Sequence, residues 1–221
     1  MNDENNCPFV NLTTYGDVEW AHYGVEKQHS DVVERSLLRA GVDRRIIGDL
    51  STTGGVANTY ANNPTVFGWS DGGSPSHSAN ASITGVFLKS GGDHDAMQGS
   101  VFMELVLSLP PPTSTDNDKN GDLFVCLYVG VYDAAARLTV SVAPKGNDTS
   151  NIVYDFPLPD QSYTNVQLKL KIPAAAATVP FTSSRRSVTI KWTLMSGKNV
   201  QLQAIAISRR CLLYTSPSPR D

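Results

Sequence analysis

Residues Leu123 to Val142 decide the fold class, and they read LFVCLYVGVYDAAARLTVSV. The first half, as far as Tyr132, is apolar on both faces, which is typical of a strand covered on both sides. The last residues alternate, with Leu138 and Val140 on one face and polar side chains on the other. We interpret Asp133 to Ala136 as the turn of a hairpin. A buried strand paired with a half-buried one predicts a two-layer β fold.

The rest of the chain repeats this alternation in short segments separated by Gly, Pro and Asn. In Val166 to Ile172, for example, apolar residues alternate with Gln167, Lys169 and Lys171. About ten such strands, with no alternation of strands and helices, predict an all-β antiparallel β-sandwich, a jelly roll. Residues 30–39 are the one expected helix. Ser30 can cap it and Gly41 can end it, and we place it on the surface.

Length and composition predict one domain. The chain has 221 residues, of which 40% are hydrophobic and 18% charged, enough for a single sandwich with a full core. We assign residues 8–208 to this domain and residues 1–7 to a disordered polar tail. Residues 209–221 break the pattern of the preceding strand and look like translated sequencing adaptor. We therefore exclude them and expect them to be disordered.

Charge and cysteine content narrow the classes of partner. The net charge is −3 and no basic stripe occurs, which argues against nucleic acid. No apolar run has membrane-spanning length. The first residues lack the pattern of a secretory signal, so we expect a cytoplasmic protein unless the sequence starts further upstream. Cys7, Cys126 and Cys211 form no disulfide framework, and Cys126 is expected to be buried.

Four aromatic residues suggest a sugar platform, namely Trp20, Tyr23, Trp69 and Tyr132. Aromatic rings stack on the apolar face of a pyranose while nearby polar groups bind its hydroxyls. The candidates for those polar groups are Asp71, Arg137, Asn62 and Asn63. The competing interpretation is that Trp20 and Trp69 are core residues on strands, as large aromatics mostly are. The predicted ligand-binding residues are Tyr23, Trp69, Asp71, Tyr132 and Arg137.

An acidic loop suggests calcium. Asp116, Asp118, Asn120 and Asp122 place oxygen ligands at alternate positions, beside a turn glycine, as in a calcium-binding loop. The twelfth position of such a loop would be Leu127 instead of Glu, which removes the bidentate ligand. The alternative, a solvated acidic loop, is therefore favoured. The sequence predicts no cofactor, with calcium at this loop as the open alternative.

No catalytic constellation is recognisable. The four histidines are scattered, and none has metal-ligand spacing or a nucleophile motif beside it. Glu19 and Glu104 lie on predicted strands, but nothing in the sequence links them as an acid–base pair. The sequence therefore predicts a protein that is not an enzyme.

Several stretches resemble one family. Glu19 to Gly24 read EWAHYG, Phe67 to Gly72 read FGWSDG, Tyr128 to Tyr132 read YVGVY, and Lys198 to Ala204 read KNVQLQA. In this order they resemble small β-sandwich accessory modules of multidomain bacterial proteins, which carry a DWAHWG signature near their start. The family has ARGRL where this chain has AAARL at residues 134–138. The resemblance implies a jelly roll of the galactose-binding type, with no established activity and no catalytic residues.

Two functions remain as hypotheses. The first is a non-catalytic binding module for a glycan or another polar surface ligand, which an aromatic residue beside a polar groove would favour. The second is a structural or assembly domain without a small ligand. Complete burial of Trp20 and Trp69 would favour that second hypothesis.

Overall fold

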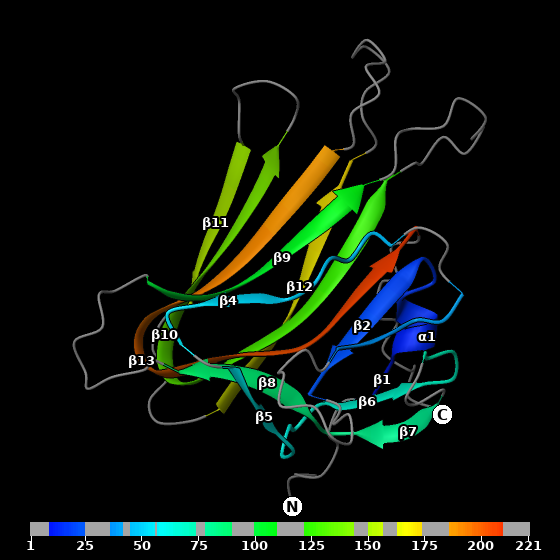
Figure 1. The fold of residues 1–221 in the computed structure, drawn as a ribbon, viewed down its shortest axis with the longest axis horizontal. Helices are drawn as coiled ribbons and strands as arrows, with labels where there is room; N and C mark the ends of the chain where they lie inside the picture. Colours follow the sequence, from blue (N-terminus) through cyan, green and yellow to red (C-terminus); the bar gives the residue numbers. More distant parts are fainter. Residues whose placement is uncertain are drawn as a thin grey trace, which may run out of the picture.

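The computed structural model describes residues 9–24, 36–41, 45–55, 57–73, 78–89, 100–109, 122–143, 150–156, 163–173 and 186–209. Within these ranges, strands dominate and one short helix is present (Figure 1). In chain order the elements are β1 (Phe9–Asn11), α1 (Leu12–Tyr15), β2 (Glu19–Tyr23), β3 (Ser36–Leu38), β4 (Ser51–Thr53), β5 (Ala57–Tyr60), β6 (Val66–Trp69), β7 (Ala79–Ser82), β8 (Gly85–Lys89), β9 (Val101–Leu109), β10 (Leu123–Ala143), β11 (Ser150–Phe156), β12 (Tyr163–Ile172) and β13 (Arg186–Ser208).

Two long antiparallel strands, β10 and β13, form the centre of the large sheet (Figure 1). They pair along almost their full lengths, and the two halves of each take different neighbours. The first half of β10 pairs with β12 and the second half with β11. The second half of β13 pairs with β2 and β8, and the first half pairs with β9. One ten-stranded sheet thus supplies both layers of a sandwich.

The predicted hairpin is wrong, because Asp133 to Ala136 continue β10 instead of turning the chain. Asp133 has φ 45°, and Gly197, close to it on β13, has φ 89°. The register then shifts between Ala135 and Ala136. Since β13 runs beside β10 through this segment, its backbone groups stay paired, and a local bend replaces a turn.

The main core lies between the two layers. Inward side chains of the first half of β10, such as Val125 and Leu127, belong to the same buried cluster as Val140 from its second half and Ile190 from β13. Complete burial of each large apolar side chain contributes roughly 1.5–3 kcal/mol. Trp192 is part of this core, and its indole nitrogen donates to the carbonyl oxygen of Gly130 over 3.2 Å.

A second core lies on the other face of β2, β10 and β13. The small sheet β1–β6–β7, in which β1 and β6 run parallel, packs there with α1 (Figure 1). The rings of Trp20 and Trp69 lie 5.6 Å apart, and those of Phe67 and Tyr128 lie 5.2 Å apart. The first half of β10 therefore has both faces covered, as its apolar composition predicts.

The predicted antiparallel jelly-roll β-sandwich is confirmed, but the predicted helix is wrong where the structure describes it. Ser36–Leu38 form β3, which pairs antiparallel with β2. Ladder pairing at this sheet edge outweighs the weak helical pattern of an isolated short segment. Residues 30–35 lie outside the described residues. Among the residues that are described, no helix is long and apolar enough to cross a membrane.

Candidate functional site

Both tryptophans that suggested a sugar platform belong to the second core. Trp20 is fully buried and Trp69 is 5% exposed. The indole nitrogen of Trp20 donates to Oδ1 of Asp71 over 2.9 Å. Neither ring face is open to solvent, so the competing interpretation of these two residues as core is the one that the structure supports.

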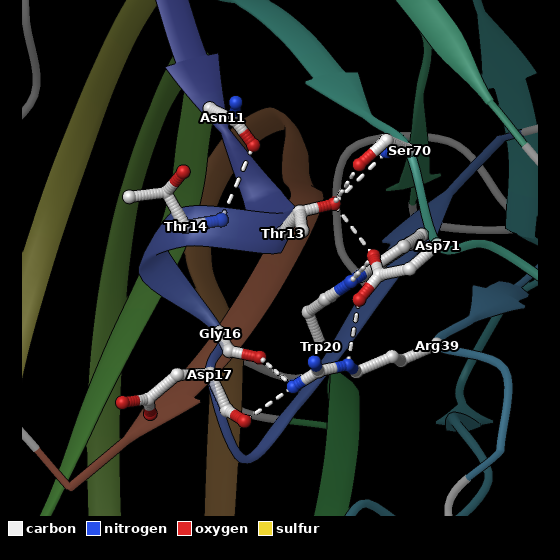
Figure 2. Close-up of polar contacts among 9 residues, drawn as sticks. All are labelled: Asn11, Thr13, Thr14, Gly16, Asp17, Trp20, Arg39, Ser70 and Asp71. Carbon is white, nitrogen blue, oxygen red and sulfur yellow. Dashed lines mark hydrogen bonds and ion pairs between the residues drawn. The ribbon is translucent and has the colours of Figure 1, made fainter.

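Asp71 is the centre of a polar cluster that we call the clasp, made of Thr13, Trp20, Arg39 and Asp71 (Figure 2). Thr13 Oγ1 donates over 2.5 Å to Asp71 Oδ1, the oxygen that also accepts from Trp20, and Arg39 Nε lies 2.7 Å from Asp71 Oδ2. Arg39 Nη1 also donates to the carbonyl oxygens of Gly16 and Asp17. The clasp ties α1 and β2 to the ends of β3 and β6, and it commits both oxygens of Asp71.

His22 is a buried core residue between the two sheets. Its Nε2 lies 2.9 Å from Ser82 Oγ and 3.1 Å from Thr84 Oγ1. Its ring centroid lies 5.0 Å from that of Phe67 and 5.1 Å from that of Trp69. Burial lowers the pKa of His22 from 6.5 to about 3, so the imidazole is neutral at physiological pH.

The remaining residues of the EWAHYG signature are also structural. Glu19 is fully buried, and its Oε2 accepts from the backbone nitrogens of Ile46 and Ile47 over 2.6 and 3.2 Å. Gly24 has φ 84°, and a Cβ there would lie 2.4 Å from the carbonyl oxygen of Gly85. The signature therefore holds β2 against its neighbours.

The predicted ligand-binding residues lie in different environments. Tyr23 is buried in the main core, where burial raises the pKa of its phenol, with smaller contributions from Glu19 and Asp49. Tyr132 and Arg137 are half-buried on β10. The Tyr132 ring lies 5.0 Å from the ammonium of Lys198. With Trp69 in the second core and Asp71 in the clasp, the structure does not bring these five residues into one site.

The candidate calcium loop is described at one position. Asp116, Asp118 and Asn120 lie outside the described residues. Asp122 is described, and its carboxylate forms an ion pair with Lys171 over 2.7 Å. Across the described ranges, no group of three or more His, Cys, Asp or Glu side chains is arranged to hold a metal ion.

The described part of the chain contains a pocket of about 340 Å³ between the small sheet and the large one. One wall comes from β1, α1 and the residue before β6, and the other comes from β10, β12 and β13. We call it the inter-sheet pocket. Its lining residues are Phe9, Val10, Tyr15, Thr65, Tyr128, Asn165, Val166, Gln167 and Gln203.

A β-bulge brings Gln203 into this pocket. Ala204 pairs with Tyr128 and Leu202 pairs with Val129, so Gln203 is an additional residue on β13. Ala204 packs in the second core and Leu202 in the main core, although residues two apart on a regular strand share a face. The bulge changes the direction of a side chain at this point, as bulges beside functional sites commonly do.

A glycine makes room for the neighbouring amide. Asn165 on β12 pairs with Gly130 on β10. A Cβ at Gly130 would lie 2.4 Å from Asn165 Oδ1, which no side chain could accept without moving the amide. The glycine of the YVGVY segment therefore has a specific role, which is to leave room beside β10 for the amide of Asn165.

Hydrogen bonds join the polar side chains of the pocket into a network. The backbone nitrogen of Thr65 donates to Asn63 Oδ1 over 3.0 Å, and Asn165 Nδ2 donates to the same oxygen over 2.8 Å. Gln203 Nε2 donates to Asn165 Oδ1 over 3.1 Å and to the Tyr60 hydroxyl over 2.8 Å. We call Thr65, Asn63, Asn165, Gln203 and Tyr60 the amide relay. Asn63 is the one polar candidate from the sequence that joins it.

The side chains of the lining residues are uncharged. Among these described residues there is no carboxylate, ammonium, guanidinium or imidazole group. The lining instead combines aromatic rings with amides and hydroxyls, which both donate and accept hydrogen bonds. Phe9 is 51% exposed, and its ring lies against the backbone of Gly68.

Comparison with known proteins gives weak matches. No protein-family profile and no curated protein matches the chain. TmCBM61 in complex with β-1,4-galactotriose is 13% identical, with a TM-score of 0.34 over 70% of this chain and 88% of that one. The family 11 carbohydrate-binding module of Clostridium thermocellum, in complex with a β-1,3-1,4-mixed-linked tetrasaccharide, is 16% identical, with a TM-score of 0.32 over 76% and 92%.

A third solved structure is the enzymatically active domain of tailspike protein 4 of bacteriophage CBA120. It is 11% identical, with a TM-score of 0.39 over 74% of this chain. The present chain spans only 19% of the length of that protein. Likeness at this level assigns neither the fold nor the ligand of this chain.

Proposed function

We propose that this chain is a non-catalytic module that binds an uncharged carbohydrate in the inter-sheet pocket. The observation that carries the proposal is the lining, in which the aromatic rings of Phe9, Tyr15 and Tyr128 stand beside the amides of Asn165, Gln167 and Gln203. A pocket with apolar walls and a few convergent polar groups is the usual form of a small-molecule site.

A sugar ring matches this lining in shape and polarity. A pyranose has an apolar C–H face that can stack on an aromatic ring, and an edge of hydroxyl groups that donate and accept. Phe9 offers a half-exposed ring supported from below by Gly68. The amides of Asn165 and Gln167 can exchange hydrogen bonds with hydroxyls, because each amide carries both donor and acceptor groups.

The absence of charge among the described lining residues selects against ionic ligands. A phosphate, sulfate or carboxylate group buried in this pocket would leave water without a cation to compensate it, which is costly. A cationic ligand would likewise find no carboxylate. A neutral saccharide loses only the hydrogen bonds between its hydroxyl groups and water, and hydrogen bonds to the amide side chains of the pocket replace them.

The alternative is a structural or assembly domain without a small ligand. It is favoured by the burial of Trp20 and Trp69 and by the clasp, in which the predicted ligand residue Asp71 is fully engaged. In that case the inter-sheet pocket holds only water. The two functions therefore differ in one measurable property, which is saccharide binding at this pocket.

The test uses the full chain and isothermal titration with cello-, xylo-, manno- and galactotetraose, and with heparin and polygalacturonate as charged probes. We expect one or more neutral tetrasaccharides to bind and the charged probes not to bind. Phe9→Ala should weaken binding by about tenfold or more, because truncation of an aromatic ring that stacks on a ligand typically costs more than 1 kcal/mol. Ile83→Ala is the matched control.

Ile83 suits that control because it is a large exposed apolar residue, 40% exposed, that does not line the pocket. If no neutral tetrasaccharide binds, the pocket proposal fails and the structural alternative stands. If a tetrasaccharide binds and both alanine variants weaken that binding equally, the pocket proposal fails without favouring the structural alternative. The titration is repeated with calcium and with a chelator. Equal affinities are expected, since none of the described lining residues is a carboxylate.

A further inference from the structure

The amide relay has a direction that is set by the backbone. The donor at its start is the backbone nitrogen of Thr65, which cannot act as an acceptor. The side-chain atom of Asn63 that lies 3.0 Å from it must therefore be the oxygen. Asn63 cannot be rotated by a half-turn about its amide axis without placing an NH₂ group against an N–H group.

The direction passes from Asn63 to the next amide. Since Asn63 presents an oxygen, the atom of Asn165 that faces it over 2.8 Å must be the nitrogen. The oxygen of Asn165 then faces Gln203, whose nitrogen lies 3.1 Å away. Each amide thus determines the orientation of the next, because an oxygen facing an oxygen would lose the hydrogen bond.

Gln203 is the last amide of the relay, and its donors are both used. One N–H of its NH₂ group donates to Asn165 and the other to the Tyr60 hydroxyl, 2.8 Å away. The hydrogen-bonding group that remains on this side chain is the carbonyl oxygen, Oε1. Gln203 is 1% exposed and lines the pocket, so the bulge on β13 sets a buried acceptor at the pocket wall.

On the basis of the proposed function, we propose that the pocket identifies its sugar by one hydroxyl group that donates a hydrogen bond to Gln203 Oε1. Gln203 presents an acceptor to the pocket because its amide cannot be turned by a half-turn alone. That turn would place its oxygen against the oxygen of Asn165, whose own orientation is fixed through Asn63 by the backbone nitrogen of Thr65. The site discriminates against a sugar in which that hydroxyl is absent, methylated or replaced by fluorine. It also discriminates against an anionic group at that position, which would face the oxygen of Gln203.

The first test needs no ligand. In the free protein, nuclear Overhauser effects should connect the side-chain amide protons of Gln203 with the ring protons of Tyr60, and these amide protons should exchange slowly with water. The amide of Gln201 is the internal reference, since its Nε2 makes a single bond, to Asn199 Oδ1. If no nuclear Overhauser effect connects Gln203 with Tyr60, and if the side-chain amide protons of Gln203 exchange with water as fast as those of Gln201, the inferred direction of the relay is wrong.

The second test uses the tightest-binding tetrasaccharide of the neutral panel, together with its monodeoxyfluoro and mono-O-methyl derivatives. At one ring position, both changes should weaken binding by about tenfold or more, because the buried acceptor then loses its donor. Tolerance of every derivative would overturn this inference while leaving the proposed function in place. Failure of the entire panel to bind would overturn both.

A matched pair of variants assigns the effect to Gln203. Gln203→Met keeps length and removes the acceptor, so it should bind the parent tetrasaccharide about tenfold more weakly and bind the critical fluoro derivative no worse than the parent. Gln201→Met makes the same change on the same strand, at a residue 2% exposed that does not line the pocket, and should bind like the wild type. Equal behaviour of the two variants contradicts the assignment.

Should Gln203→Met fail to fold, Asn165→Leu tests the same point. A leucine at that position keeps the branched shape but offers Gln203 Nε2 no acceptor, so the relay no longer fixes which end of the Gln203 amide faces the pocket. We expect about a tenfold loss of affinity and a weaker preference for the hydroxyl over fluorine. Unchanged affinity with unchanged fluorine discrimination would show that the relay does not orient Gln203.

Discussion

The clasp and the inter-sheet pocket lie at two margins of the same aromatic core, and both combine aromatic rings with polar side chains. In the clasp, Thr13, Trp20 and Arg39 all direct their polar groups to the carboxylate of Asp71. In the pocket, the relay ends at a carbonyl oxygen on Gln203, and the ring of Phe9 remains half exposed. Closed networks hold a fold together, whereas a network that ends at a cavity can accept a ligand.

The largest effect should come from the clasp side. Trp20→Ala removes a fully buried indole and leaves Asp71 without one of its donors, so the free energy of unfolding should fall by about 3–5 kcal/mol. Phe9→Ala, on the pocket side, should change it by less than about 0.5 kcal/mol. Guanidinium denaturation measures both. Similar losses in the two variants would erase the distinction between the two regions.

The buried imidazole between the sheets gives the next effect. Because the folded-state pKa of His22 is about 3 against 6.5 when unfolded, the unfolded chain binds the proton first as pH falls. The stabilising contribution is complete above pH 6.5, and it declines by about 1.4 kcal/mol per pH unit as pH falls toward 3. Denaturation of the wild type and of His22→Gln on both sides of pH 6.5 isolates this term. Parallel pH profiles would contradict it.

A glycine on β10 links packing to binding. Gly130→Ala would place a Cβ 2.4 Å from Asn165 Oδ1, which should cost about 1–3 kcal/mol of stability and displace the relay, with about a tenfold loss of affinity for the best neutral tetrasaccharide. Adding Asn165→Ser should recover part of the lost stability, because the Thr164 carbonyl oxygen would still lie 3.0 Å from the new Cβ, and should not recover affinity. If the double variant binds like the wild type, the relay does not orient the site.

The smallest effect should come from the ion pair of the clasp. Asp71→Asn keeps an oxygen for Trp20 and Thr13 but places an NH₂ group against Nε of Arg39, so the guanidinium, whose side chain is about a quarter exposed, has to turn toward water and the ion pair is lost. Unfolding free energy should fall by about 0.2–1 kcal/mol, less at high salt, and saccharide affinity should not change. A loss of affinity would return Asp71 to the ligand site, where its sequence motif had suggested it.

Much of the fold follows from apolar alternation. The continuous apolar run of β10 correctly predicts a strand with both faces covered, and the alternation along β12 predicts its two faces. The predictions of a hairpin at Asp133 and of a helix over residues 36–39 are wrong. The structure at both places is determined by pairing with a strand that is distant in the sequence. Local patterns do not report that β13 continues beside β10 or that Ser36–Leu38 pair with β2.

The site was harder to predict, for a physical reason. Asn165, Gln167 and Gln203 occupy positions that look like ordinary solvent-facing residues of alternating strands. The bulge that turns Gln203 into the pocket has no local sequence signal, since it arises from the register between β10 and β13. Trp20 and Trp69 were predicted as candidates for a sugar platform because they are aromatic residues in polar motifs. In the structure, the polar residue Asp71 accepts a hydrogen bond from the buried indole nitrogen of Trp20.

The most direct test of the account is a titration of the isotopically labelled full chain with the four neutral tetrasaccharides, followed by the side-chain N–H signals in NMR spectra. We predict that one or more of the sugars shifts the amide signals of Asn165, Gln167 and Gln203 and leaves the indole N–H signal of Trp20, which is bonded to Asp71, in place. Saturable shifts at Trp20 without shifts at the pocket amides, or no shifts with any sugar, would contradict the account.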